Sequence, residues 1–177
     1  ILRTFRLGYP GVDLVLDEST TEQQLRALAE DRIDVGFLRP PFEQRGLVCE
    51  TVVREPVVAA LPDFHPLAKM QTITLKQLAG DPFVSLPRRL IPGFHDQIAA
   101  ACRRAGFTPR VTQEALQIQT IVSLVAAGMG VALVPASLRK GQRKGVRYLD
   151  IAGTPLTAEI VAAHRAGAGD SGPLRAF

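Results

Sequence analysis

Three hydroxyl side chains, Ser19, Thr20 and Thr21, stand together before a predicted helix and are followed by Glu22. This order fits a capping box, in which a hydroxyl and a carboxylate satisfy free backbone N–H groups at the start of a helix. The same free N–H groups, with the partial positive charge of a helix start, can bind a small anion. The pattern therefore supports two interpretations equally, a helix cap and an anion site.

A second group, Pro92, Gly93 and Phe94, opens another predicted helix, Pro92–Ala105. Proline suits the first position of a helix, because its missing N–H has no partner there in any case. An aromatic ring beside helix-terminal N–H groups could hold a small, flat carboxylate. The alternative, equally supported, is that Phe94 packs against its own helix.

Phe37 and Arg39 follow a predicted strand, Asp34–Leu38. An arginine at the end of a strand could pair with a carboxylate through two parallel hydrogen bonds. A solvated surface arginine is the commoner case. We include both residues as candidate ligand-binding residues.

No residue pattern predicts catalysis, a metal or a cofactor. The histidines His65, His95 and His164 are scattered along the chain, and Cys49 and Cys102 form no Cys-x-x-Cys pair. The sequence also contains no Gly-x-Ser-x-Gly or His-Glu-x-x-His motif. We predict a protein that is not an enzyme, with no metal, no cofactor and two buried free thiols, as is usual in the cytoplasm.

Gly128-Met129-Gly130 contains two of the three glycines of a dinucleotide-binding fingerprint, but in the wrong context. A phosphate-binding loop lies between a strand and the helix that follows it. Here the predicted helix Ile118–Ala127 comes first and the apolar run Val131–Val134 follows. We therefore predict that Gly128 ends the helix in the left-handed conformation, and that no nucleotide binds.

Length and charge narrow the class of protein. The chain has 177 residues, enough to bury a core, and a net charge of +4 that gives little support to nucleic-acid binding. No apolar run is long enough to span a membrane. The basic cluster Arg139–Arg147 contains two glycines and no aromatic residue, so we predict a solvated loop there.

Helical and strand patterns alternate along the whole chain, which predicts the α/β fold class. Two extended stretches marked by proline predict two crossovers between lobes. Both ends have helical patterns. The predicted strands are Val12–Glu18, Asp34–Leu38, Leu47–Leu61 with a break at Glu55-Pro56, Phe83–Leu86, Val111–Ala115, Val131–Val134, Val146–Ile151 and Leu156–His164, and the predicted helices follow Ser19 and span Pro92–Ala105 and Ile118–Ala127.

Four segments in register resemble one family. They are Tyr9–Leu14 (Tyr-Pro-x-Val-x-Leu), Leu28–Phe37, His65–Ala68 and Val125–Pro135, which has the form Val-Ala-Ala-Gly-x-Gly-Val-x-Leu-Val-Pro. Together they resemble the effector-binding domain of LysR-type transcriptional regulators. Asp31 departs from the pattern, because glycine is commoner there.

The resemblance implies two Rossmann-like subdomains joined by two crossover strands, as in periplasmic binding proteins, with the ligand between them. We place one subdomain at residues 1–54 plus 153–177 and the other at 55–152. From the resemblance we expect that the family's DNA-binding helix-turn-helix domain is not part of this chain. The implied partners are a small carboxylate effector, aromatic or dicarboxylic, a second copy in a homodimer or homotetramer, and DNA only through the missing domain, with no membrane.

The resemblance also assigns roles to residues. Family members use a Ser or Thr at the position of Thr21 to hold an effector carboxylate, and Pro92–Phe94 is similar to a Pro-x-Phe segment of aromatic-catabolism regulators. The implied function is effector sensing that modulates DNA binding by the intact, cytoplasmic regulator. The alternative is a free-standing solute-binding protein of the periplasmic type.

Overall fold

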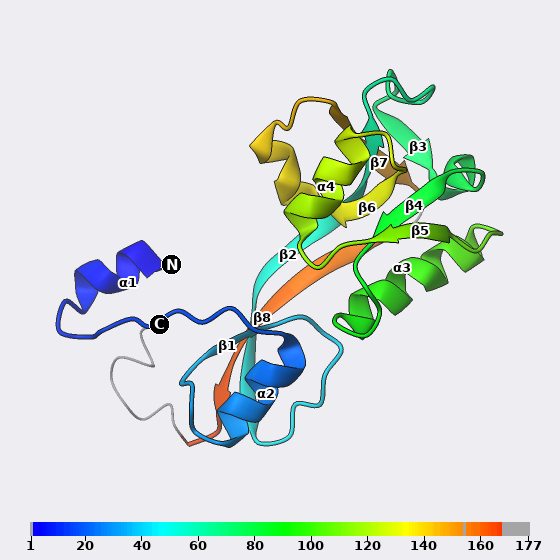
Figure 1. Cartoon of the computed structure of the whole chain (residues 1–177). Helices are drawn as coiled ribbons and strands as arrows, with labels where there is room; N and C mark the ends of the chain where they lie inside the picture. The colour runs from blue at the N-terminus through cyan, green and yellow to red at the C-terminus, as the bar shows by residue number, and fades with distance from the viewer. Residues whose placement is uncertain (1, 154, 168–177) are drawn as a thin grey trace. The chain divides into compact units, whose positions relative to one another are not determined.

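The computed structural model describes residues 2–153 and 155–167, which divide into two compact units. Unit 1 is Ile1–Val52 with Ile160–Phe177, and unit 2 is Val53–Glu159. Two long strands belong to both units, β2 (Leu47–Pro62) and β8 (Thr157–Arg165) (Figure 1). The division expected from the sequence fell at 54/55 and at 152/153; the second of these points lies before β8, whereas the units divide within β8.

Among its described residues, unit 1 contains two helices and one short strand besides its parts of β2 and β8. The elements are α1 (Leu2–Gly8), α2 (Thr21–Ala29) and β1 (Gly36–Leu38). β1 pairs with β8 in antiparallel fashion, with Phe37 opposite Ala162. The buried residues Leu28, Leu38 and Ala163 form its core, so α2 packs on the strand pair through a single apolar stripe. The helix predicted at the end of the chain lies outside the described residues.

The predicted strand Val12–Glu18 is wrong. These residues form no strand, and Val15 and Leu16 are 92% and 70% exposed. Apolar alternation indicates a strand only where a neighbouring strand completes the ladder. Within residues 2–153 and 155–167 no strand pairs with this segment.

Unit 2 is built around β2, which pairs in antiparallel fashion with both β6 and β7, while β3 runs parallel to β7. β4 and β5 form a parallel pair, which a bridge between Phe83 and Val131 connects to the segment before β6. Its elements are β3 (Thr72–Thr74), η1 (Leu75–Leu78), β4 (Pro82–Ser85), α3 (Pro92–Arg104), β5 (Arg110–Glu114), α4 (Ile118–Ala126), β6 (Ala132–Pro135), η2 (Ala136–Gly141) and β7 (Val146–Ala152).

The strand and helix predictions for unit 2 are confirmed with small shifts at their ends, and so is the α/β class. The predicted break at Glu55-Pro56 is wrong, because β2 continues through it. A proline interrupts a strand only where its missing N–H is needed in the ladder. The next residue, Val57, donates to the carbonyl of Leu156 at 2.8 Å and keeps the strand in place. The basic cluster Arg139–Arg147, predicted as a loop, is not a loop throughout. It begins in η2 and ends in β7.

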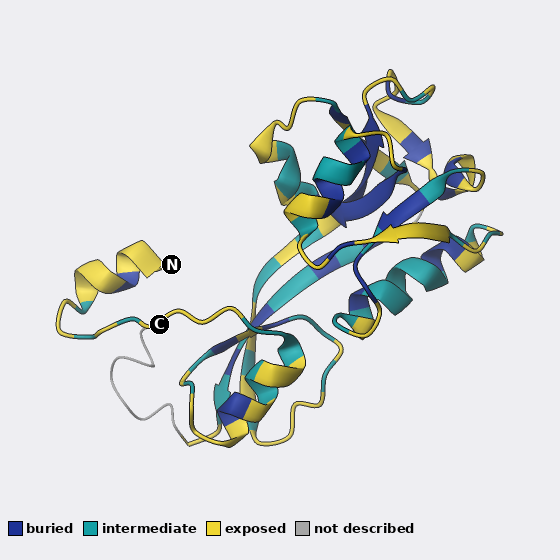
Figure 2. Cartoon of the chain, viewed as in Figure 1, coloured by how far each residue is buried: buried dark blue, intermediate teal, exposed yellow. Residues whose placement is uncertain are grey.

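The core of unit 2 runs through β2, β4, β6 and β7 and under the two helices (Figure 2). Gly128 has a φ of +78° directly after the last turn of α4, which confirms the predicted left-handed cap. Gly130 has a φ of +147°, and an added Cβ would lie 2.4 Å from the carbonyl oxygen of Pro82. Glycine is therefore required at both positions, at Gly128 because of its left-handed backbone conformation and at Gly130 also because the Pro82 carbonyl leaves no space for a Cβ.

The described part of the chain contains no helix long and apolar enough to cross a membrane. Both cysteines are free thiols. Cys102 is buried as predicted, and burial raises the pKa of its thiol to about 11. Cys49 is only half-buried, since it lies on β2 in unit 1, where few apolar side chains are available to cover it.

Candidate functional site

The N-terminus of α2 is capped by Thr20. The Thr20 hydroxyl accepts from the backbone N–H of Gln23 at 3.3 Å, and the Gln23 side chain accepts from the Thr20 N–H at 2.9 Å. The capping box is real but lies one residue later than the expected Ser19–Glu22 pair, because the helix begins at Thr21. Glu22 instead lies 3.8 Å from Arg26 on the exposed side of the helix. No acceptor for the N–H groups of Thr21 and Glu22 is found in the described part of the chain.

Two side chains connect this helix start to β1. The Thr21 hydroxyl oxygen accepts from the backbone N–H of Arg39 at 3.2 Å. Gln24 accepts from the N–H of Phe37 at 2.8 Å and donates to the carbonyl of Ser19 at 2.9 Å. Five of the eight predicted site residues, Ser19, Thr20, Thr21, Phe37 and Arg39, are thus brought to one place.

The local chemistry suits a carboxylate. Because the Thr21 oxygen already accepts a hydrogen bond, its O–H is left to donate to a ligand. The free N–H groups of the first turn add donors with the partial positive charge of the helix start. Sequence reasoning missed Gln24, which fixes both neighbouring segments. Its only signal was its place one turn into the helix, on the same side as Thr21.

The other three predicted residues lie in unit 2, at the start of α3. Pro92 is exposed, Gly93 is half-buried, and Phe94 is 7% exposed and belongs to the core. Phe94 also lines a pocket at the end of β4, so its packing and a ligand-facing position do not exclude each other. The pocket is lined by Phe83, Val84, Ser85, Leu86, Phe94, His95, Ile98, Ile118, Ile121 and Leu133.

This pocket is mostly apolar and partly open. Its empty volume of about 370 Å³ includes space open to solvent, and the enclosed part has room for little more than a water-sized group. Only two of its lining residues, Ser85 and His95, carry polar side chains. It lies where β4 ends and α3 and α4 begin, which is the usual place for ligands in α/β folds.

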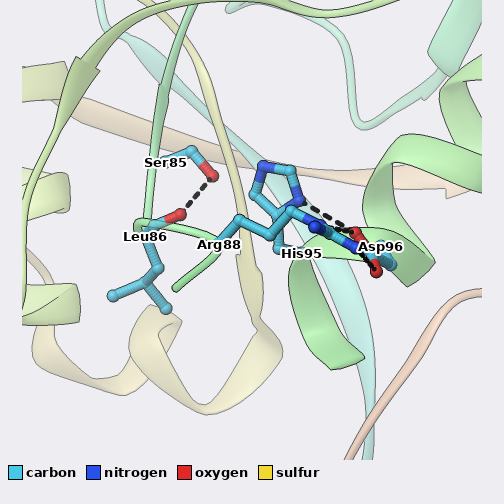
Figure 3. A network of polar contacts seen from close by, with 5 residues as sticks. All are labelled: Ser85, Leu86, Arg88, His95 and Asp96. Carbon is cyan, nitrogen blue, oxygen red and sulfur yellow. Dashed lines mark hydrogen bonds and ion pairs between the residues drawn. The ribbon is translucent and has the colours of Figure 1, made fainter. Parts of the chain in front are cut away.

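A polar network stands beside the pocket (Figure 3). Arg88 donates two hydrogen bonds to Asp96, at 2.7 and 2.8 Å, and Nδ1 of His95 lies 3.3 Å from the same carboxylate. The hydrogen bond from Arg88 is the main reason that the pKa of Asp96 is lowered to about 2. The Ser85 hydroxyl donates to the carbonyl of Leu86 at 3.2 Å. Asp96 is therefore an anion at pH values well above 2, and its carboxylate faces the His95 ring.

The comparisons with known proteins agree with this architecture. The model of the LysR substrate-binding domain matches residues 1–177. The chain belongs to the LysR substrate-binding domain family.

Among curated relatives of this LysR domain, the HTH-type transcriptional regulator AlsR of Bacillus subtilis is 34% identical over 165 residues, which is 93% of this chain and 55% of that protein. The HTH-type transcriptional regulator CatR of Pseudomonas putida is 36% identical over 156 residues, 88% of this chain and 54% of that protein. The chain spans about half the length of these relatives. A solved structure of the BenM effector-binding domain with its effector benzoate is 28% identical, with a TM-score of 0.81 over 93% of this chain and 75% of that one.

The fold of the LysR domain is thus that of effector-binding domains with a periplasmic-binding-protein-like, two-subdomain architecture. The predicted site residues fall into two groups, one in each unit. His95 and Ser85 were not predicted, although each had a signal, His95 by following Phe94 and Ser85 by ending a buried strand. No group of three or more His, Cys, Asp and Glu side chains placed to hold a metal occurs among the described residues.

Proposed function

We propose that this LysR domain senses a small carboxylate effector, aromatic or dicarboxylic, on behalf of a cytoplasmic transcriptional regulator. The observation that carries the proposal is the start of α2, where the Thr21 O–H and the first-turn N–H groups are left to donate. Three donors at one helix start, the Thr21 O–H and the N–H groups of Thr21 and Glu22, favour an anion over a neutral ligand. The similarity to a BenM domain that binds benzoate supports the carboxylate class.

Each candidate residue has a role in this proposal. Thr21 donates to the carboxylate, and Ser19 and Thr20 shape the turn that presents the helix start. Arg39 supplies the balancing positive charge, and Phe37 supplies apolar contact. Pro92, Gly93 and Phe94 start α3 beside the unit 2 pocket, which would hold an apolar group.

The direct test is ligand-induced stabilisation of this chain by benzoate and by a dicarboxylate such as adipate. A ligand at 100 times its Kd stabilises the folded state by about 2.7 kcal/mol. Thr21→Val should weaken binding roughly tenfold, because it removes a donor to a charged acceptor. Thr21→Ser should restore it, and Thr108→Val, an exposed threonine in unit 2, should leave it unchanged.

Two outcomes would contradict the proposal. No stabilisation by any aromatic or dicarboxylic acid would remove the sensor function. Binding that is indifferent to Thr21→Val and to Arg39→Gln would move the site elsewhere. That one effector contacts both groups of residues stays a prediction, and it requires that Arg39→Gln and Phe94→Leu each lower the affinity for the same acid.

In the intact regulator, we propose that effector binding shifts the conformational equilibrium of a homodimer or homotetramer and so alters DNA binding by a separate domain. The names of the relatives favour this over the periplasmic solute-binding alternative.

The chain alone should self-associate in sedimentation at tens of micromolar. It should bind DNA only weakly, equally across sequences and with strong salt dependence. Specific, salt-resistant DNA binding would contradict the assignment of DNA recognition to another domain.

A further inference from the structure

The polar atoms of the unit 2 pocket can be assigned as donors or acceptors. The Asp96 carboxylate only accepts hydrogen bonds, since its pKa is about 2. Its contact with His95 Nδ1, at 3.3 Å, is therefore favourable only where Nδ1 carries the hydrogen. In a neutral imidazole the other nitrogen, Nε2, is then an acceptor.

Ser85 contributes a second acceptor. Its O–H is used in the hydrogen bond to the carbonyl of Leu86, so its oxygen is left with lone pairs alone. The two side chains line the same pocket, whose remaining walls are apolar and whose enclosed part fits a water-sized group. Ser85 and His95 both line this pocket, and Figure 3 shows the Arg88 side chain running past the His95 ring to Asp96.

A carboxylate fits this pocket poorly. When the His95 ring is neutral, a carboxylate would meet two acceptors and the nearby negative charge of Asp96, and the apolar walls would strip its water. A methyl group would leave the acceptors unpaired. A hydroxyl group has the right size and brings the missing donor.

We propose that this pocket recognises a hydroxyl substituent of the effector, with His95 as the specificity-determining acceptor and the Arg88–Asp96 pair as the device that orients it. The inference rests on the proposed function and deepens it, because it specifies a hydroxylated carboxylate, such as a hydroxy-substituted aromatic acid. Asp96 and Arg88 are positioning residues, and they act on the ligand only through the His95 ring.

The test compares two probes of equal shape, 4-hydroxybenzoate and 4-methylbenzoate, and their 3-substituted isomers, by calorimetry on the full chain. The hydroxyl probe of at least one isomer pair should bind about tenfold more tightly than its methyl partner. His95→Phe keeps a planar ring and should abolish this preference. His164→Phe, at a histidine of unit 1, should retain it. Asp96→Asn should reduce the preference to about twofold. The asparagine amide can donate as well as accept, so it no longer requires a hydrogen on Nδ1 of His95.

Nitrogen-15 NMR of His95 supplies a readout that a merely structural role would not move. At a pH where the ring is neutral, the free domain should show the tautomer with hydrogen on Nδ1, and the hydroxyl probe should shift the Nε2 resonance. If a variant fails to fold, Ser85→Ala, which should lower the preference several-fold, provides the independent measurement. Equal affinity for the two probes, with binding still sensitive to Thr21→Val, would overturn this inference alone. No binding of any probe would overturn it together with the proposed function.

Discussion

The two candidate ligand-binding regions are held in place by different forces. In unit 1, the start of α2 is fixed to β1 and the residue after it by hydrogen bonds that Gln24 and Thr21 accept from backbone N–H groups, over a small core centred on Leu28 and Leu38. In unit 2, the pocket lies directly on a core that extends through the six strands β2, β3, β4, β6, β7 and β8 and the helices α3 and α4. Apolar burial contributes far more to stability than single hydrogen bonds do. Unit 1 should therefore be the softer region, whose geometry a ligand can change, and unit 2 the rigid one.

The largest loss of unfolding free energy is expected from a substitution that the backbone of unit 2 has no space for. Gly130→Ala would place a Cβ 2.4 Å from the Pro82 carbonyl oxygen, at a φ of +147°. Strand β4 and the segment before β6 cannot separate without breaking the hydrogen bond from the Val131 N–H to that oxygen, which is 2.8 Å long. We expect a loss of about 2–4 kcal/mol in unfolding free energy, measured by chemical denaturation.

The matched control is Gly141→Ala, where an added Cβ meets nothing within 4 Å. That variant should remain within about 0.5 kcal/mol of the parent protein. A Gly130→Ala protein with the parent's denaturation midpoint would show that the backbone of unit 2 adjusts easily, and the contrast between the units would disappear.

The next effect tests the hydrogen bonds of unit 1. Gln24→Ala removes the acceptor of the Phe37 N–H and the donor to the Ser19 carbonyl, and should cost about 1–2 kcal/mol. Amide hydrogen exchange at Phe37 should accelerate about tenfold, while exchange in β6 stays unchanged. Gln119→Ala, at an exposed glutamine of α4, is the control. Unchanged protection of Phe37 would mean that packing alone holds α2 on β1.

The same difference explains what could be predicted from the sequence. Gly128 and β6 were predicted correctly because the signals, a capping glycine and a buried apolar run, are local. The segment Val12–Glu18 has an equally clear local pattern, but its outcome depends on whether another strand lies beside it. The contact of Gln24 with Phe37, and the grouping of Ser85 with His95 in one pocket, join residues ten or more positions apart, and periodicity carries no information about such pairs.

A smaller effect is expected at the edge of unit 2. Gly128→Val places a β-branched residue at a φ of +78°, and its Cβ would lie 2.9 Å from the Phe64 ring. Phe64 is 73% exposed and can turn away, so the cost arises mainly from backbone strain. We expect a loss of about 1–2 kcal/mol in unfolding free energy. An effect as large as that of Gly130→Ala would show that Phe64 is as fixed as the core.

The smallest effect on stability is expected from the charges beside the pocket. It tests whether Asp96 is held as firmly as the core of unit 2. The pKa of Asp96 in the folded domain is about 2, below the ordinary value of an aspartate, about 3.9. A carboxyl group whose pKa is lowered by folding stabilises the folded state at pH values above its unfolded pKa. That contribution should be present above about pH 4 and lost as the pH falls toward 2. Since both partners are exposed, the effect on global stability should be small.

Arg88→Gln removes the principal cause of this shift, so the pKa of Asp96 should rise toward its ordinary value in a carbon-13 titration of the carboxyl groups. The acid-induced loss of stability should then be smaller than in the parent protein. Arg89→Gln, at the neighbouring exposed arginine, should leave the titration of Asp96 unchanged. If Arg88→Gln did not move that pKa, the anion facing His95 would owe its low pKa to its other contacts. The Arg88–Asp96 pair would then not be what orients the ring, and the rigid character of this region would be confined to its apolar core.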